Sequence, residues 1–151
     1  MGLNEGEQFP DLNTQTHQGQ AFSLSGYRGQ KNVVLYFYPK DLTPGCTREA
    51  IDFDRKLEQF GEYDTVVVGV SVDPKSDHES FSAACGLHFP LLSDTDRTLS
   101  RQLGILNEKG TYAKRTTFVI DKTGKVRKIF HVTQVDGHVD QVLEAVSSLK
   151  P

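Results

Sequence analysis

The most informative stretch of the chain is residues 33–46, which read VVLYFYPKDLTPGC. Its first six residues are apolar or aromatic at odd and even positions alike, as expected of a strand buried on both faces of a sheet. Pro39 ends this strand. Thr43 is a favourable residue to precede a helix and Pro44 suits the first helical position. The stretch therefore predicts a buried strand, a short loop and a helix with Cys46 in its first turn.

Further elements are expected on both sides of this stretch. Apolar residues in a 4-3-4-3 spacing predict a helix over residues 44–60, and a second run rich in valine predicts a buried strand over 65–72. The first 30 residues read as a loose hairpin. The remaining predicted elements are a helix over 76–85, a helix over 95–103 capped by Ser93 or Asp94, a β-hairpin of 117–120 and 126–131, and a last helix with Val139, Val142, Leu143, Val146 and Leu149 on its inner face.

This order of elements indicates the fold class. The strand, crossover helix and strand at the start require a parallel pair, whereas the late hairpin requires an antiparallel one. The sheet must then be mixed and flanked by helices. We predict an α/β, thioredoxin-like fold with an N-terminal β-hairpin, formed as a single domain over residues 1–151.

Composition narrows the class of protein. The chain has 151 residues, 36% of them hydrophobic and 25% charged, and a formal net charge of -3. These values are typical of a soluble globular protein and do not favour a nucleic-acid partner. No apolar run approaches the ~20 residues that span a bilayer, and residues 1–10 do not resemble a signal peptide. We therefore expect a cytoplasmic protein with no membrane partner.

Metal binding is not expected from the sequence. The histidines show no close spacing with cysteine or aspartate of the kind that forms a zinc site, so we interpret them as ordinary surface or loop residues. They are His17, His78, His88, His131 and His138.

The two cysteines, Cys46 and Cys85, are too few to staple a secreted fold, and their interest is in their reactivity. A thiol at a helix N-terminus, near a cation, is favoured as the nucleophilic thiolate. A cysteine on the apolar side of a helix can equally be a small hydrophobic residue. The position of Cys46 alone leaves both interpretations open.

A wider pattern favours the nucleophile. The spacing Pro39-x-x-x-Thr43-x-x-Cys46 resembles the active-site motif of the peroxiredoxins. With FPLLSD at residues 89–94 and RTTFVID at 115–121, the chain resembles the bacterioferritin comigratory protein, or PrxQ, subfamily over nearly its whole length.

The resemblance implies a thiol peroxidase that reduces hydrogen peroxide and organic hydroperoxides through a sulfenic acid on Cys46. It implies recycling by thioredoxin or a similar thiol reductant, no cofactor and a monomer. It also implies that the catalytic arginine is Arg115, rather than Arg48 or Arg97, and that Glu49 is supporting structure.

Peroxide reduction by a thiolate needs hydrogen-bond donors, because negative charge develops on the leaving oxygen. Thr43 can supply a hydroxyl, and the backbone amides of Gly45 and Cys46 can supply N–H groups. Pro39 would exclude water without competing for hydrogen bonds. We expect these residues and Arg115 to form the peroxide site.

The chain departs from the family pattern at the second cysteine. Ile51 stands where many relatives carry a resolving cysteine, five residues after the peroxidatic one. We predict that Cys85 is the resolving cysteine and forms an intramolecular disulfide with Cys46, as some relatives resolve from this helix. The alternative is that Cys85 is a buried apolar residue and an external thiol reduces Cys46. A disulfide requires Cα atoms within about 7 Å, and a thiolate in a peroxide pocket is shielded, so we expect one or both helix ends to unwind, with Gly86 as a hinge.

Three other functions fit a thioredoxin-like fold. A disulfide oxidoreductase would need Cys-x-x-Cys, and a copper chaperone would need Cys-x-x-x-Cys with a histidine; neither cysteine pair is present. A redox-inert binding or holdase module is the third alternative, because a fold alone does not determine function.

Overall fold

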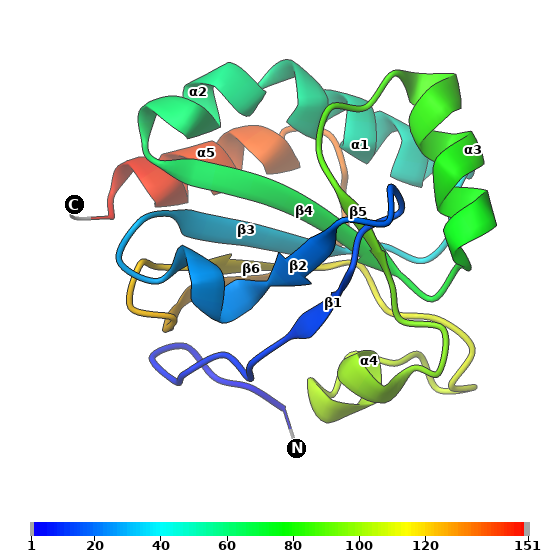
Figure 1. The fold of residues 1–151 in the computed structure, drawn as a ribbon, viewed down its shortest axis with the longest axis horizontal. Helices are drawn as coiled ribbons and strands as arrows, with labels where there is room; N and C mark the ends of the chain where they lie inside the picture. Colours follow the sequence, from blue (N-terminus) through cyan, green and yellow to red (C-terminus); the bar gives the residue numbers. More distant parts are fainter. Residues whose placement is uncertain (1, 150–151) are drawn as a thin grey trace.

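The computed structural model describes residues 2–149, and its centre is a five-stranded sheet of order β5-β4-β3-β6-β7 (Figure 1). β4 is parallel to β3 and β5, whereas β6 is antiparallel to β3 and β7. The mixed sheet predicted from the sequence is therefore confirmed. Its strands are β3 (Asn32–Phe37), β4 (Thr65–Ser71), β5 (Leu91–Ser93), β6 (Thr116–Ile120) and β7 (Val126–His131).

Helices cover one face of this sheet, and the N-terminal hairpin with α4 lies on the other side (Figure 1). The helices on the covered face are α1 (Pro44–Arg55), α2 (Leu57–Glu62), α3 (Lys75–Cys85) and α5 (His138–Ser147). The helix on the side of the hairpin is α4 (Thr98–Gln102). The hairpin pairs β1 (Asn13–Gln15) with β2 (Ala21–Ser23) and continues into a 3-10 helix, η1 (Leu24–Tyr27). The predicted hairpin is thus confirmed. Among the residues described, no helix has both the length and the apolarity of a membrane span.

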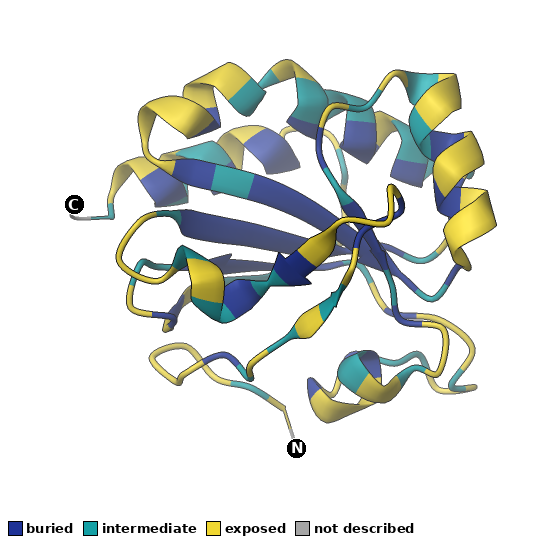
Figure 2. Ribbon diagram, viewed as in Figure 1, coloured by how far each residue is buried: buried dark blue, intermediate teal, exposed yellow. Residues whose placement is uncertain are grey.

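β3 divides the apolar core into two clusters, because successive side chains of a strand point to opposite faces. Val33, Leu35 and Phe37 belong to the cluster beneath the hairpin and α4. Val34 and Tyr36 belong to the cluster that α1, α2, α3 and α5 cover, and this second cluster contains Cys46. All six residues of β3 are buried, so the strand anchors both layers (Figure 2). The loop before Cys46 therefore starts from a rigid strand end.

Two predicted helices differ from those observed. The helix expected over 44–60 is interrupted at Lys56, although Phe53 and Phe60 on either side still share one apolar cluster. The helix expected over 95–103 spans only five residues, because Arg97 adopts a left-handed φ of 63° immediately before it. Asp94 does stabilise the start of α4, since its carboxylate accepts hydrogen bonds from backbone N–H groups there.

β5 was not expected as a strand. Three residues are too few to show a sequence periodicity, and β5 is recognisable only by its parallel pairing with β4.

Candidate active site

The site is centred on Cys46, the third residue of α1. Pro44 occupies the start of the helix, so Cys46 lies in the first turn as predicted. Its side chain is only 1% exposed and belongs to the apolar cluster under the helices. The first N–H groups of a helix have no intrahelical acceptor and favour negative charge nearby. The location therefore suits a thiolate that is shielded from bulk water.

Arg115 is the cation beside this sulfur. Arg115 immediately precedes β6, and its Nη2 atom lies 3.3 Å from the Cys46 Sγ atom. Burial alone would lower the pKa of Arg115, but the charges of Glu49 and Cys46 raise it, so the guanidinium remains charged. The two other arginines considered lie elsewhere: Arg48 binds the exposed carboxylate of Asp136 at 2.8 Å, and Arg97 bonds to backbone carbonyls. Arg115 alone of the three contacts the sulfur.

Glu49 holds the other side of the guanidinium. Its Oε1 accepts a hydrogen bond from Arg115 Nη1 at 2.5 Å. Burial raises the pKa of Glu49 to about 7, in spite of the opposing charge of Arg115. Because Glu49 lies one turn after Cys46, α1 presents both the sulfur and the carboxylate to Arg115. Glu49 is thus in direct contact with the arginine.

His138 completes the surroundings of Glu49. The Glu49 Oε2 atom is buried without a hydrogen-bond partner among the described residues, and His138 Nε2 lies 3.9 Å from it. Burial, followed by the charge of Arg115, lowers the pKa of His138 to about 4. A neutral His138 instead shares a 2.9 Å hydrogen bond with the hydroxyl of Thr117. This side of the site therefore adds no second cation.

Thr43 differs from its expected role as a donor. Its hydroxyl donates to the Lys40 carbonyl at 2.9 Å, and it makes no side-chain hydrogen bond to the helix N-terminus. A hydroxyl that donates one hydrogen bond retains lone pairs. In this conformation Thr43 can accept a hydrogen bond from a peroxide O–H group, whereas donation would require rotation of the hydroxyl.

Gly45 and Pro39 also lie in the loop and helix start around Cys46. A Cβ atom at position 45 would lie 3.3 Å from Arg115 Nη2, so glycine leaves room for the guanidinium beside the sulfur. Pro39 is half-buried at the end of β3. The described geometry therefore brings Cys46, Arg115 and Gly45 together, with Pro39 and Thr43 on the adjoining loop.

Cys85 is the last residue of α3 and is half-buried against the apolar cluster that contains Cys46. Both cysteines are free thiols in the structure. Burial, with a smaller effect of the Asp41 charge, raises the pKa of the Cys85 thiol. Gly86 follows in a left-handed conformation that ends the helix, as expected of its position.

Three histidines were wrongly interpreted as ordinary surface or loop residues. His17, His78 and His138 are buried, at 6%, 0% and 2% exposure, and each forms hydrogen bonds. His78 lies three residues before Phe81 and seven before Cys85, which places it on the buried stripe of α3. That spacing could have identified it from the sequence.

Comparisons with known proteins show the family to which the chain belongs. The AhpC/TSA family matches residues 6–129, and the chain therefore belongs to this family. Peroxiredoxin Bcp of Bacillus subtilis is 38% identical over 155 residues, covering 99% of this chain and 98% of that protein.

Solved structures narrow the group further. Peroxidoxin BcpB from Mycobacterium tuberculosis superposes with a TM-score of 0.90 at 33% identity, covering 99% of both chains. A cysteine-to-serine mutant of Xylella fastidiosa PrxQ superposes with a TM-score of 0.91 at 32% identity, covering 98% of both chains. The similarity is thus to Bcp/PrxQ peroxiredoxins, and the chain is a peroxide-reducing enzyme of that group with a thioredoxin-like fold.

Proposed function

We propose that Cys46 is the nucleophile of this peroxidase and that Arg115, Thr43, Gly45 and Pro39 form its peroxide site. The observation that carries the proposal is the 3.3 Å contact between the Arg115 guanidinium and a buried Cys46 sulfur at a helix N-terminus. The cation favours the thiolate and remains available to stabilise charge on the peroxide oxygens.

The reaction begins with attack of the Cys46 thiolate on one peroxide oxygen. The S–O bond forms as the O–O bond breaks, so that the sulfur is oxidised to a sulfenic acid. The leaving alkoxide or hydroxide takes a proton from solvent and departs as alcohol or water. Arg115 and the first-turn amides of α1 are placed to stabilise the leaving oxygen.

Resolution of the sulfenic acid is assigned to Cys85. Its thiolate would attack the Cys46 sulfur as the S–O bond breaks; the displaced hydroxide takes a proton from solvent and leaves as water. The product is an intramolecular disulfide that thioredoxin or a similar dithiol then reduces. The shared apolar cluster supports this assignment, since both cysteines contact it. Because Cys46 is buried and Cys85 is half-buried, a helix end has to unwind first, and the exposed Ala83 and Ala84 make the last turn of α3 the more easily unwound.

The substrate class includes organic hydroperoxides as well as hydrogen peroxide. A solved relative, the Xanthomonas campestris bacterioferritin comigratory protein, is described by its alkyl peroxide reduction activity; it superposes with a TM-score of 0.84 at 34% identity. The half-buried Pro39 and the apolar cluster beside Cys46 are compatible with an alkyl group. A monomeric, cytoplasmic protein of one domain stays a prediction from the sequence.

A pair of serine variants tests both cysteines. Cys46→Ser should consume no peroxide, because sulfur supplies the nucleophile. Cys85→Ser should oxidise Cys46 as fast as the unmodified chain but then accumulate a trappable sulfenic acid, and sulfinic acid under excess peroxide. The measurements are peroxide consumption and mass spectrometry of the intact protein.

The outcomes separate the alternatives. Peroxide consumption by Cys46→Ser above a few per cent would exclude Cys46 as the nucleophile. Wild-type turnover of Cys85→Ser with thioredoxin, and no bond between Cys46 and Cys85 in the oxidised protein, would indicate a one-cysteine mechanism. A free thiol on Cys46 after a stoichiometric peroxide pulse would indicate a redox-inert module.

A further inference from the structure

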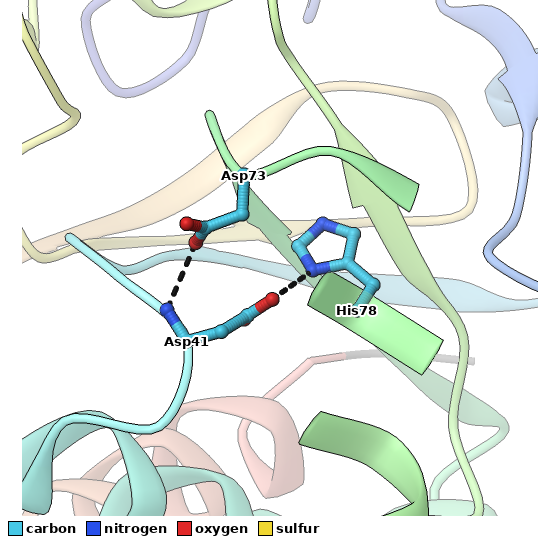
Figure 3. Close-up of side chains that lie close together, drawn as sticks. All are labelled: Asp41, Asp73 and His78. Atoms are coloured by element: carbon cyan, nitrogen blue, oxygen red, sulfur yellow. Dashed lines mark hydrogen bonds and ion pairs between the residues drawn. The ribbon is translucent and has the colours of Figure 1, made fainter. Parts of the chain in front are cut away.

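A second buried cluster is centred on Asp41, which lies in the loop between β3 and α1, with Asp73 and His78 beside it (Figure 3). The Asp41 Oδ1 atom accepts a hydrogen bond from the Tyr38 hydroxyl at 2.6 Å, and Oδ2 lies 2.6 Å from His78 Nδ1. Its backbone N–H donates to Asp73 Oδ2 at 2.8 Å. Asp41 is therefore bound by the residue that follows β3, by the segment after β4 and by α3.

His78 is bonded through both ring nitrogens. Its Nε2 lies 2.8 Å from the Leu92 carbonyl oxygen, which can only accept, and its Nδ1 faces the Asp41 carboxylate. Opposite an ionised Asp41 both nitrogens donate, so that the pair consists of an imidazolium and a carboxylate. Burial alone lowers the pKa of His78, but the hydrogen bond and charge of Asp41, the Leu92 carbonyl and the charge of Asp73 raise it overall.

This ion pair is inaccessible to water. The side chains of His78 and Asp41 are 0% and 2% exposed. Removal of one member of a buried pair leaves the other charge unpaired in a medium that solvates it poorly. Loss of His78 would therefore leave Asp41 without its charged partner and would displace it toward solvent.

Asp41 is followed by a residue in an unfavourable backbone conformation. Leu42 has a φ of 65°, in the left-handed region that branched side chains avoid. Its side chain is 56% exposed, so burial of that side chain cannot compensate. Such conformations persist where the surroundings determine them. The bonds of Asp41 to Tyr38, Asp73 and His78 supply that constraint, two residues before the N-cap of α1.

The same three side chains could in principle surround a cation. The ligand atoms of Asp41, Asp73 and His78 lie within 4.8 Å of one another. A metal needs a free imidazole lone pair, and both nitrogens of His78 already face acceptors. The Asp41 Oδ1 atom already accepts from Tyr38, and the Asp73 Oδ2 atom accepts from Ser71 and a backbone amide. The bonding pattern therefore favours a structural network over a metal site.

We propose that His78 is a positioning residue for peroxide reduction: through Asp41 it holds residues 39–45 in the conformation that places Thr43 and Gly45 beside Cys46. The inference rests on the proposed function of Cys46 as the peroxidatic nucleophile. It gives α3 a role in the peroxide step that is separate from the proposed role of Cys85, which acts only afterwards.

The test compares two histidine variants in the full reduced chain. His78→Gln loses the buried pair. His88→Gln is the matched control, since His88 also pairs with an aspartate, Asp54, at 2.9 Å, but is 78% exposed. Each protein is mixed rapidly with hydrogen peroxide, quenched in acid and analysed for oxidation of Cys46 by mass spectrometry. Alkylation of Cys46 by iodoacetamide is measured in parallel.

His78→Gln should react with peroxide at least about tenfold more slowly, because catalysis by aligned groups is lost with small displacements. His88→Gln should remain within about twofold of the wild type, as expected for an exposed pair. Iodoacetamide needs no peroxide-binding groups, so its rate should change less than about threefold in either variant. A rise in alkylation that accompanies the slower peroxide step would indicate general loosening of the fold and would overturn the proposal.

Two further variants keep the proposal testable if His78→Gln folds poorly. Asp41→Asn preserves shape but removes the charge, and it should slow the peroxide step in the same way. Leu42→Gly, added to His78→Gln or to Asp41→Asn, should raise the rate of Cys46 oxidation at least about threefold above that of the single variant, because glycine adopts positive φ without strain. No recovery, or wild-type rates in both His78→Gln and Asp41→Asn, would overturn the proposal.

These outcomes differ from a failure of the proposed function. If Cys46 of the wild type does not react with peroxide, the nucleophile is misassigned and the positioning role falls with it. If Cys46 reacts rapidly in the wild type and equally rapidly in His78→Gln, the function stands and only the role of His78 is wrong.

Discussion

Glu49 provides a quantitative test of the electrostatics of the site. Its side chain is fully buried, and burial raises its pKa to about 7 from the ordinary value of 4.5. Glu49→Gln replaces the carboxyl group by a neutral amide of nearly the same shape, whose oxygen can still accept the hydrogen bond from Arg115. The variant therefore removes the ionisation of Glu49 and little else.

The shift in pKa sets the size and direction of the effect on stability. Below about pH 4.5 the carboxyl group is protonated in both folded and unfolded chains, and it adds no pH dependence. Between about pH 4.5 and 7 the unfolded chain loses this proton while the folded chain retains it, so stability falls as the pH rises. Above about pH 7 both forms are ionised and the loss is complete. A difference of about 2.5 pKa units corresponds to ~3 kcal/mol.

The assay is urea unfolding of reduced wild type and Glu49→Gln at pH 5 and pH 8. We expect similar free energies of unfolding at pH 5 and a variant more stable than the wild type by ~3 kcal/mol at pH 8. The control, Glu58→Gln, alters an exposed carboxylate of α2 and should show no such change. A difference between Glu49→Gln and the wild type that does not vary with pH would refute the assignment of a raised pKa.

Three other substitutions give independent predictions. Arg115→Ala should slow the reaction of Cys46 with peroxide at least about tenfold, a loss of about 1.4 kcal/mol, measured by rapid mixing; an unchanged rate would remove Arg115 from the peroxide site. Thr43→Val should lower that rate while leaving the free energy of unfolding nearly unchanged; the reverse result would limit the Thr43 hydroxyl to its structural bond with the Lys40 carbonyl. Gly69→Ala should destabilise the fold by about 1–3 kcal/mol in urea, because a Cβ there would lie 2.8 Å from the Leu91 side chain; wild-type stability would contradict that contact.

Much of the fold was predictable because its signals are local. Residues 33–46 contain the doubly buried strand, the proline that ends it and the start of α1, and all three occur nearly where the sequence indicates. The turn between β6 and β7 was likewise predicted from a few adjacent residues. The break at Lys56 was not, since the same apolar stripe continues on both sides of it.

The candidate site was predictable in part. Proline, threonine and cysteine at family spacing led to Cys46, and the family motif led to Arg115, but neither determined what each side chain contacts. Thr43 illustrates the difference, because its hydroxyl donates to a backbone carbonyl three residues earlier.

Local patterns in the chain establish the helices, the longer strands and the motif around Cys46, because each depends on residues within a few positions of one another. The contacts that give the site its chemistry join distant residues: Arg115 lies 69 positions from Cys46, and His78 lies 37 positions from Asp41. Such contacts arise only when β6 and α3 take their places beside β3 and its loop. Burial at the site raises the pKa of Glu49. Packing of α3 brings the buried His78 against the Asp41 carboxylate. Neither the proximity of these residues nor their loss of contact with solvent can be read from local sequence patterns.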